Sequence, residues 1–92
     1  MAVSFPNQSR SFDSTRNAVR FWGYDSAMET SFFVTADALR RLEPGAGTDE
    51  SNLLRAFDCN RELICATAAR LYARSSRGSY DLIASDFAKA GS

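Results

Sequence analysis

The residues of this chain that could do chemistry are two cysteines and a set of arginines and carboxylates, because the sequence contains no histidine. Histidine is the side chain whose ordinary pKa lies near neutral pH, and it is the commonest general base and metal ligand. Without it, a nucleophilic triad, a zinc protease site and a histidine-gated switch are excluded. The sequence therefore favours binding or scaffolding over catalysis.

Cys59 and Cys65 lie six residues apart. On one helix that spacing turns the second side chain by about 240° from the first, so the two thiols could not form a disulfide. Two thiols without a histidine do not make a zinc site, and neither has an obvious activating base. We expect reduced thiols in a cytoplasmic protein, with no catalytic residue, no metal and no cofactor.

Arg61 is the first charged residue of interest. On a straight helix it falls in an apolar stripe between Phe57 and Ile64, and a charge there must be paired or lie at an opening. One interpretation is that its stem covers apolar surface while its guanidinium reaches Asp58 or Glu62. The other is an anion site, which could belong to a small anion-binding protein or enzyme.

Arg70, Arg74 and Arg77 form a second group, at the C-terminal end of the same predicted helix. Cations there complement the helix dipole, and a nucleic-acid-binding patch is the alternative. Eleven acidic residues balance eleven basic ones, so the formal net charge is zero. A neutral chain fails the first test for nucleic-acid binders, and it leaves little repulsion between copies of itself.

A hairpin is predicted from strands over 18–22 and 27–34, joined by a four-residue loop that sets Arg20 opposite Glu29. Alternation places Arg20, Trp22 and Phe33 on the face away from the core. The core face then takes Val19, Phe21, Met28, Phe32 and Val34.

Arg20, Trp22 and Phe33 are the candidate interaction surface. Large aromatic residues that face away from the helices would be exposed in a monomer, and such patches mark interaction sites. The alternative is that the N-terminal segment covers them through Phe5 and Phe12. We expect a protein partner or a homodimer at this face, with nucleic acid as the lesser alternative.

The other elements follow from capping and turn residues. A short strand is expected over 3–5 and a surface connection over 7–15. Thr35 can cap a helix over 36–42, and Thr48 a long helix that could reach Ser75 or Ser76, with a possible break over 58–60. A last strand is expected over 80–84, with Phe87 in the core.

Ninety-two residues make one domain, with an ordered core over about 3–87 and a short flexible C-terminal tail. We predict an α+β, two-layer fold: a small antiparallel sheet of three to four strands with two to three helices on one face, in the order ββ(β)-α-α-β. No apolar run approaches the ~20 residues that span a bilayer, so no membrane contact is expected. The N-terminus has no signal-peptide pattern.

The chain as a whole resembles the small bacterial proteins grouped as domain of unknown function family 1488. The residues that carry the resemblance are Phe5-Pro6-Asn7, Ala18-Val19-Arg20-Phe21-Trp22-Gly23, Ser31-Phe32-Phe33-Val34, Ala38-Leu39, Ala56-Phe57-Asp58, Arg61, Ile64, Gly78-Ser79-Tyr80 and Asp86-Phe87. The resemblance implies a compact cytoplasmic α+β domain and supplies no catalytic residue, cofactor or partner. The sequence thus predicts a non-catalytic protein-binding or self-associating module.

Overall fold

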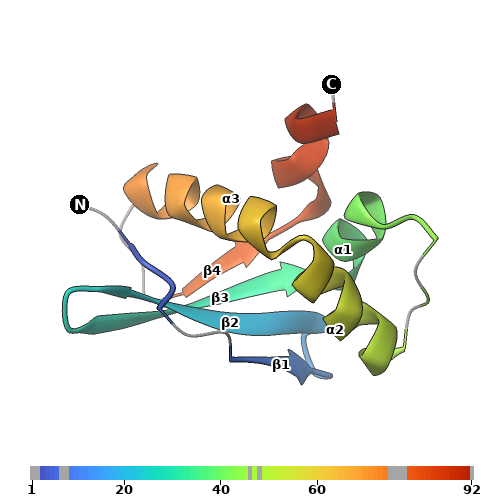
Figure 1. Ribbon diagram of the computed structural model, residues 1–92, viewed down its shortest axis with the longest axis horizontal. Coiled ribbons are helices and arrows are strands. Elements are labelled where there is room, and N and C mark those ends of the chain that lie inside the picture. The colour runs from blue at the N-terminus through green and yellow to red at the C-terminus, as the bar shows by residue number, and fades with distance from the viewer. Residues whose placement is uncertain (1–2, 7–8, 46, 48, 75–78, 92) are drawn as a thin grey trace.

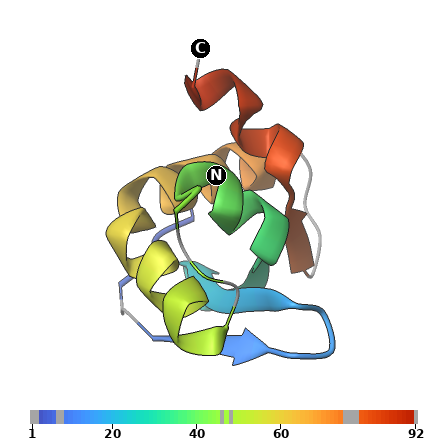
Figure 2. The ribbon, with the colours of Figure 1, turned by 90° about the vertical axis from the view of Figure 1, so that its right-hand side faces the viewer.

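The structure is a computed structural model that describes residues 3–6, 9–45, 47, 49–74 and 79–91, with 88–91 described by their backbone alone. Four strands form one sheet, and the helices pack on one of its faces (Figure 1). In the two views of Figures 1 and 2, none of the described helices lies on the opposite face. The predicted α+β fold is confirmed.

The sheet has its strands in chain order, β1-β2-β3-β4. They are β1 (Arg10–Asp13), β2 (Ala18–Asp25), β3 (Met28–Thr35) and β4 (Ser79–Leu82). The first three are antiparallel as predicted, but β4 runs parallel to β3, with Tyr80 beside Phe32. The sheet is mixed because the intervening helices carry the chain back to the end at which β3 begins, as a parallel crossover requires.

The β2–β3 register differs from the predicted one. Arg20 lies opposite Phe33 rather than Glu29, and Asp25 pairs with Met28. The hairpin turns at only two residues, where Ser26 takes the left-handed conformation (φ 57°) that such a turn requires. The shift is an even number of residues, so each side chain keeps its predicted face. Met28 is nevertheless 70% exposed, because the hairpin tip extends beyond the helices (Figure 1).

The N-terminal residues form more sheet than predicted. The expected connection over 7–15 contains β1, whose Phe12 pairs with Val19. The expected strand over 3–5 is reduced to an isolated bridge, in which the backbones of Ser4 and Tyr24 exchange two hydrogen bonds of 2.8 Å. The Phe5 ring packs on the helix-side face of the sheet, 5.9 Å from the Phe21 ring centroid.

The helices are α1 (Ala36–Leu42), α2 (Glu50–Cys59), α3 (Arg61–Arg74) and the 3-10 helix η1 (Ala84–Gly91). Thr35 caps α1 as predicted, because its hydroxyl accepts a hydrogen bond from the backbone N–H of Ala38 (3.1 Å). The cap predicted at Thr48 lies outside the described residues, and Asp49 stands at the N-cap of α2. The predicted long helix breaks at Asn60, within the segment expected to be weakest.

The core lies between the helices and the inner face of the sheet. A row of aromatic rings crosses it, with centroid separations of 5.0 Å for Phe57 and Phe21, 5.4 Å for Phe21 and Phe32, and 5.2 Å for Phe32 and Tyr80. Phe87 of η1 is buried, as predicted. This row of rings fixes β2, β3 and β4 relative to one another, and so it fixes the side chains on their opposite face.

Candidate functional site

The outer face, as we call the sheet face away from the helices, receives alternate residues of three strands. Val19 and Phe21 point into the core, so Arg20 and Trp22 of β2 point outward. The same alternation places Ser31 and Phe33 of β3 and Asp81 of β4 there. The structure therefore brings Arg20, Trp22 and Phe33 together on one face, as the sequence predicts.

An arginine–aromatic stack, formed by Arg16, Phe33, Arg20 and Trp22, occupies this face. The Cζ atom of Arg16 lies 4.2 Å from the centre of the Phe33 ring. Arg20 lies between the two rings, with its Cζ atom 5.0 Å from the centre of Trp22 and 5.7 Å from that of Phe33. Cation–π contacts of this kind contribute about 0.5–1 kcal/mol each at exposed sites.

Hydrogen bonds fix the two guanidinium groups of the stack. Arg16 forms an ion pair with Asp81 (3.3 Å), and Arg20 donates from Nη2 to the Ser31 hydroxyl (2.9 Å). The Nε atom of Arg20 is buried and has no hydrogen-bond acceptor among the described residues. A buried donor without an acceptor costs about 1–3 kcal/mol, and the attraction of Arg20 to the two rings acts against this loss.

Phe33 corrects one part of the prediction. It lies on the outer face, but only 6% of its surface is exposed, because Arg16 lies over the ring. The alternative, that Phe5 and Phe12 cover this face, is also wrong. Both residues pack against the core cluster on the inner face. Trp22 and Arg20 are half-buried and Arg16 is exposed, so these three side chains form the accessible part of the stack.

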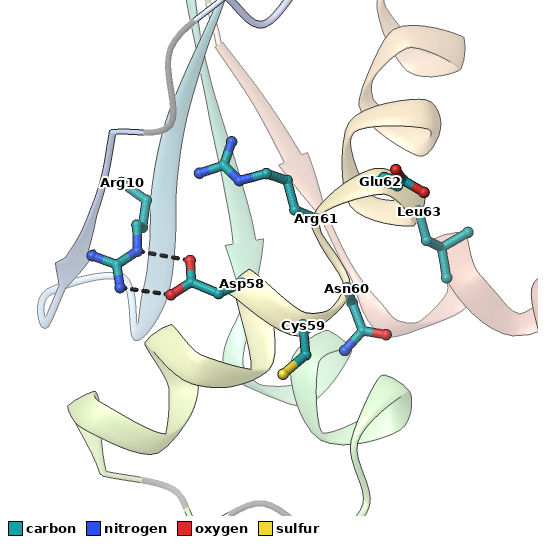
Figure 3. Close-up of a pocket in the computed structure, with 7 residues that line it drawn as sticks. All are labelled: Arg10, Asp58, Cys59, Asn60, Arg61, Glu62 and Leu63. Carbon is teal, nitrogen blue, oxygen red and sulfur yellow. Dashed lines mark hydrogen bonds and ion pairs between the residues drawn. The ribbon is translucent and has the colours of Figure 1, made fainter.

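Arg61 lies at the corner between α2 and α3. Its Cζ atom is 4.9 Å from the centre of the Phe57 ring, and it lines a pocket of about 870 Å³ with Arg10, Asp58, Cys59 and neighbouring residues (Figure 3). Asp58 was an expected partner, but its carboxylate takes two hydrogen bonds from Arg10, of 2.9 and 2.8 Å. That pair forms because the sheet edge at β1 packs beside α2, a proximity the sequence did not reveal.

The charges around this corner shift two pKa values. The hydrogen bonds from Arg10, with the nearby positive charge of Arg61, hold the pKa of Asp58 below its ordinary value. Burial raises the pKa of the Cys65 thiol, and Arg61 opposes that shift only in part. A thiol with a raised pKa stays protonated at neutral pH and is a poor nucleophile. Both cysteines are free, as expected.

The basic group at the end of α3 is only partly described. Arg70 donates a hydrogen bond to the Thr67 hydroxyl (3.2 Å), and Arg74 is exposed in the last turn of the helix. Arg77 lies outside the described residues. A nucleic-acid-binding patch formed by these arginines stays a prediction.

Within 3–6, 9–45, 47, 49–74 and 79–91, no three Cys, Asp or Glu side chains gather in a way that could hold a metal ion. In the same part of the chain, no helix has both the length and the apolar character needed to cross a bilayer.

The family model described as "Protein of unknown function (DUF1488)" matches residues 3–83 of this chain. The chain belongs to the DUF1488 family. The resemblance noted from the sequence is thereby confirmed.

A solved DUF1488 structure has the same fold. The crystal structure of a DUF1488 protein of unknown function from Shewanella loihica PV-4, at 1.60 Å resolution, is similar over 88% of this chain and 91% of that one. The TM-score is 0.77 and the sequence identity is 18%, so the likeness concerns the fold alone. No curated protein matches the chain.

Sequence reasoning missed two residues of this DUF1488 site. Arg16 sits in the turn between β1 and β2, just after the connection predicted over 7–15, and Asp81 is carried by the strand β4. Their ion pair needs the sheet to bring β4 alongside β3, which no local signal reveals. Arg20 was predicted on this face, but its position opposite Phe33 follows only from the register that the structure shows.

Proposed function

We propose that this DUF1488 protein is a non-catalytic, cytoplasmic binding module that associates with a second copy of itself through the outer face. The observation that carries the proposal is the arginine–aromatic stack, which lies on a sheet face that none of the described helices covers. Tryptophan and arginine are the residues that most often dominate the energy of protein interfaces.

Trp22 is the residue on which the interface depends most. Its indole is half-buried in the single chain, so part of its apolar surface still contacts water. Removing apolar surface from water is worth about 25 cal/mol per Å². The cation–π contact with Arg20 already orders the ring, so association would lose little side-chain entropy.

A second copy is the partner we infer, because the outer face carries both cations and acceptors. Arg16 and Arg20 present guanidinium groups, whereas Asp81 and Glu29 present carboxylates. Two such faces that meet about a two-fold axis offer each other opposite charges. The zero net charge adds no overall repulsion, and the two free cysteines fit a reducing cytoplasm.

The test uses Trp22 as its own probe, since it is the single tryptophan of the chain. We expect sedimentation to show a dimer that dissociates on dilution, with the Trp22 emission moving to longer wavelength over the same concentration range. The Trp22→Ala variant should weaken the dimer at least about 30-fold, the equivalent of about 2 kcal/mol for a dominant interface residue.

Met28→Ala is the matched control, because Met28 is exposed at the hairpin tip and belongs to the other face. Phe33→Ala is avoided because its buried ring supports the fold. A chain that stays monomeric at every concentration, or a dimer of unchanged stability in Trp22→Ala, would refute the proposal. The proposal would also be refuted if the outer face around Trp22 bound a different protein and never a second copy of this chain.

A further inference from the structure

A groove in the helical layer lies between α1, the α2–α3 corner and η1. Figure 2 looks onto this side of the molecule, with α1 near its centre and η1 above it. The groove has a volume of about 760 Å³, within the range of pockets that hold small ligands. Its apolar lining consists of Leu42, Pro44, Leu63, Ala84 and Phe87.

One large apolar side chain at this groove is exposed. Leu63 of α3 lines the groove and is 36% exposed. An exposed apolar side chain that borders a hollow marks an interaction site more often than a scattered one does. The buried ring of Phe87 lies at the same groove, so an apolar group that enters it meets packed carbon.

Positive charge borders one side of the groove. Arg40 and Arg41 of the last turn of α1 both line it and are exposed. The one carboxylate in the lining, Asp37, approaches Arg40 at 3.7 Å, and both side chains are mostly in water, so this pair is weak. The lining thus holds two guanidinium groups and one carboxylate, an excess of one positive charge, and Asn60 holds the carboxylate of Glu43 nearby.

Asn60 adds a polar group at the corner of the groove. Its Nδ2 donates to the carboxylate of Glu43 (3.2 Å) and to the backbone carbonyl of Ala56 (2.9 Å). Both amide hydrogens are thus used within the chain, whereas the Oδ1 atom of this lining residue can accept a hydrogen bond from a backbone N–H in the groove.

We propose that this groove binds a short peptide segment of a partner protein in which a large apolar side chain stands beside aspartate or glutamate. The apolar side chain contacts Leu63 and Phe87. The carboxylates pair with Arg40 and Arg41, whose planar groups suit carboxylate oxygens. This site is separate from the outer face and does not depend on self-association.

The test is the selection of random peptides displayed on phage against the purified full chain. We expect the selected peptides to share an apolar residue flanked by Asp or Glu. One of them, synthesised with a fluorescent label, should bind at least about tenfold more weakly to Leu63→Glu and to Arg41→Glu, because each change sets a carboxylate against the peptide. Binding should also weaken with added salt.

Ala66→Glu is the matched control, because it adds the same charge to an exposed position of α3 that does not line the groove. Trp22→Ala is the second control and should bind the peptide as the parent chain does. Circular dichroism establishes that every variant is folded. Selected peptides without acidic residues, affinity unchanged in Leu63→Glu, no selected peptide at all, or binding lost in Trp22→Ala would each overturn the proposal.

Discussion

Gly23 gives the sharpest test of how the N-terminal segment packs. It lies on the inner face of β2, and a Cβ atom added there would stand 2.7 Å from Cγ2 of Val3 and 2.8 Å from Cε1 of Phe5. Favourable carbon–carbon contacts lie at about 3.5–4.0 Å. The Gly23→Ala variant therefore cannot keep both contacts, and we expect the segment at 3–6 to leave the sheet.

The structure sets the size of this effect. Detachment breaks the two 2.8 Å backbone hydrogen bonds between Ser4 and Tyr24, each worth about 0.5–1.5 kcal/mol net. If the segment stays in place, the overpacking costs about 1–3 kcal/mol. Both routes lower the free energy of unfolding by about 1–3 kcal/mol, and each kcal/mol lowers the Tm of a domain of this size by about 4–8 °C.

Urea unfolding followed by circular dichroism measures the loss, and hydrogen exchange locates it. We expect the Tyr24 amide to exchange faster in Gly23→Ala, while the Phe21 amide inside the sheet stays protected. Gly45→Ala is the matched control, because nothing lies within 4 Å of the added Cβ, and it should change stability by less than about 0.5 kcal/mol. An unchanged midpoint together with an unchanged Tyr24 exchange rate would refute the packing described for Val3 and Phe5.

Three further predictions concern single contacts. Thr35→Ala should lower the free energy of unfolding by about 1 kcal/mol, because it removes the cap of α1, whereas Thr35→Ser should restore it in chemical denaturation. The hydrogen bond to Asp25 raises the pKa of Tyr72 above its ordinary value of 10.0. Stability should then fall as pH rises above about 10, and Tyr72→Phe should abolish that fall in pH-dependent melting. Arg10 lowers the pKa of Asp58, so the ion pair stabilises the fold above about pH 4, and this stabilisation is lost as the pH falls below that value. In pH-dependent melting, Asp58→Asn should remove this loss of stability at acid pH, and it should lower the free energy of unfolding by under about 1 kcal/mol at neutral pH.

Local signals were sufficient for much of the fold. The cap at Thr35 depends on residues close in sequence, and its prediction is confirmed. The break at Asn60 falls in the segment over 58–60, where the sequence allows a break. The two faces of the hairpin were also predicted, because alternation survives an even shift in register. The turn itself was not, since Ser26 is not a residue type that usually takes a left-handed conformation.

Contacts between distant segments could not be predicted from one sequence. The pairing of β4 beside β3, the ion pair of Arg16 with Asp81 and the bidentate pair of Arg10 with Asp58 each join elements separated by most of the chain. The burial of Phe33 could not be predicted for the same reason, because Arg16 covers its ring only when the β1–β2 turn folds beside β3.

The parallel pairing of β4 has a consequence for synthesis on the ribosome. The nascent chain can complete the β1–β2–β3 meander before its helices emerge, but the far edge of β3 has to wait for Ser79–Leu82. Until then its N–H and C=O groups are unpaired, and such an edge is a template for another chain. Premature termination within α3 should therefore give aggregating fragments rather than a smaller folded protein.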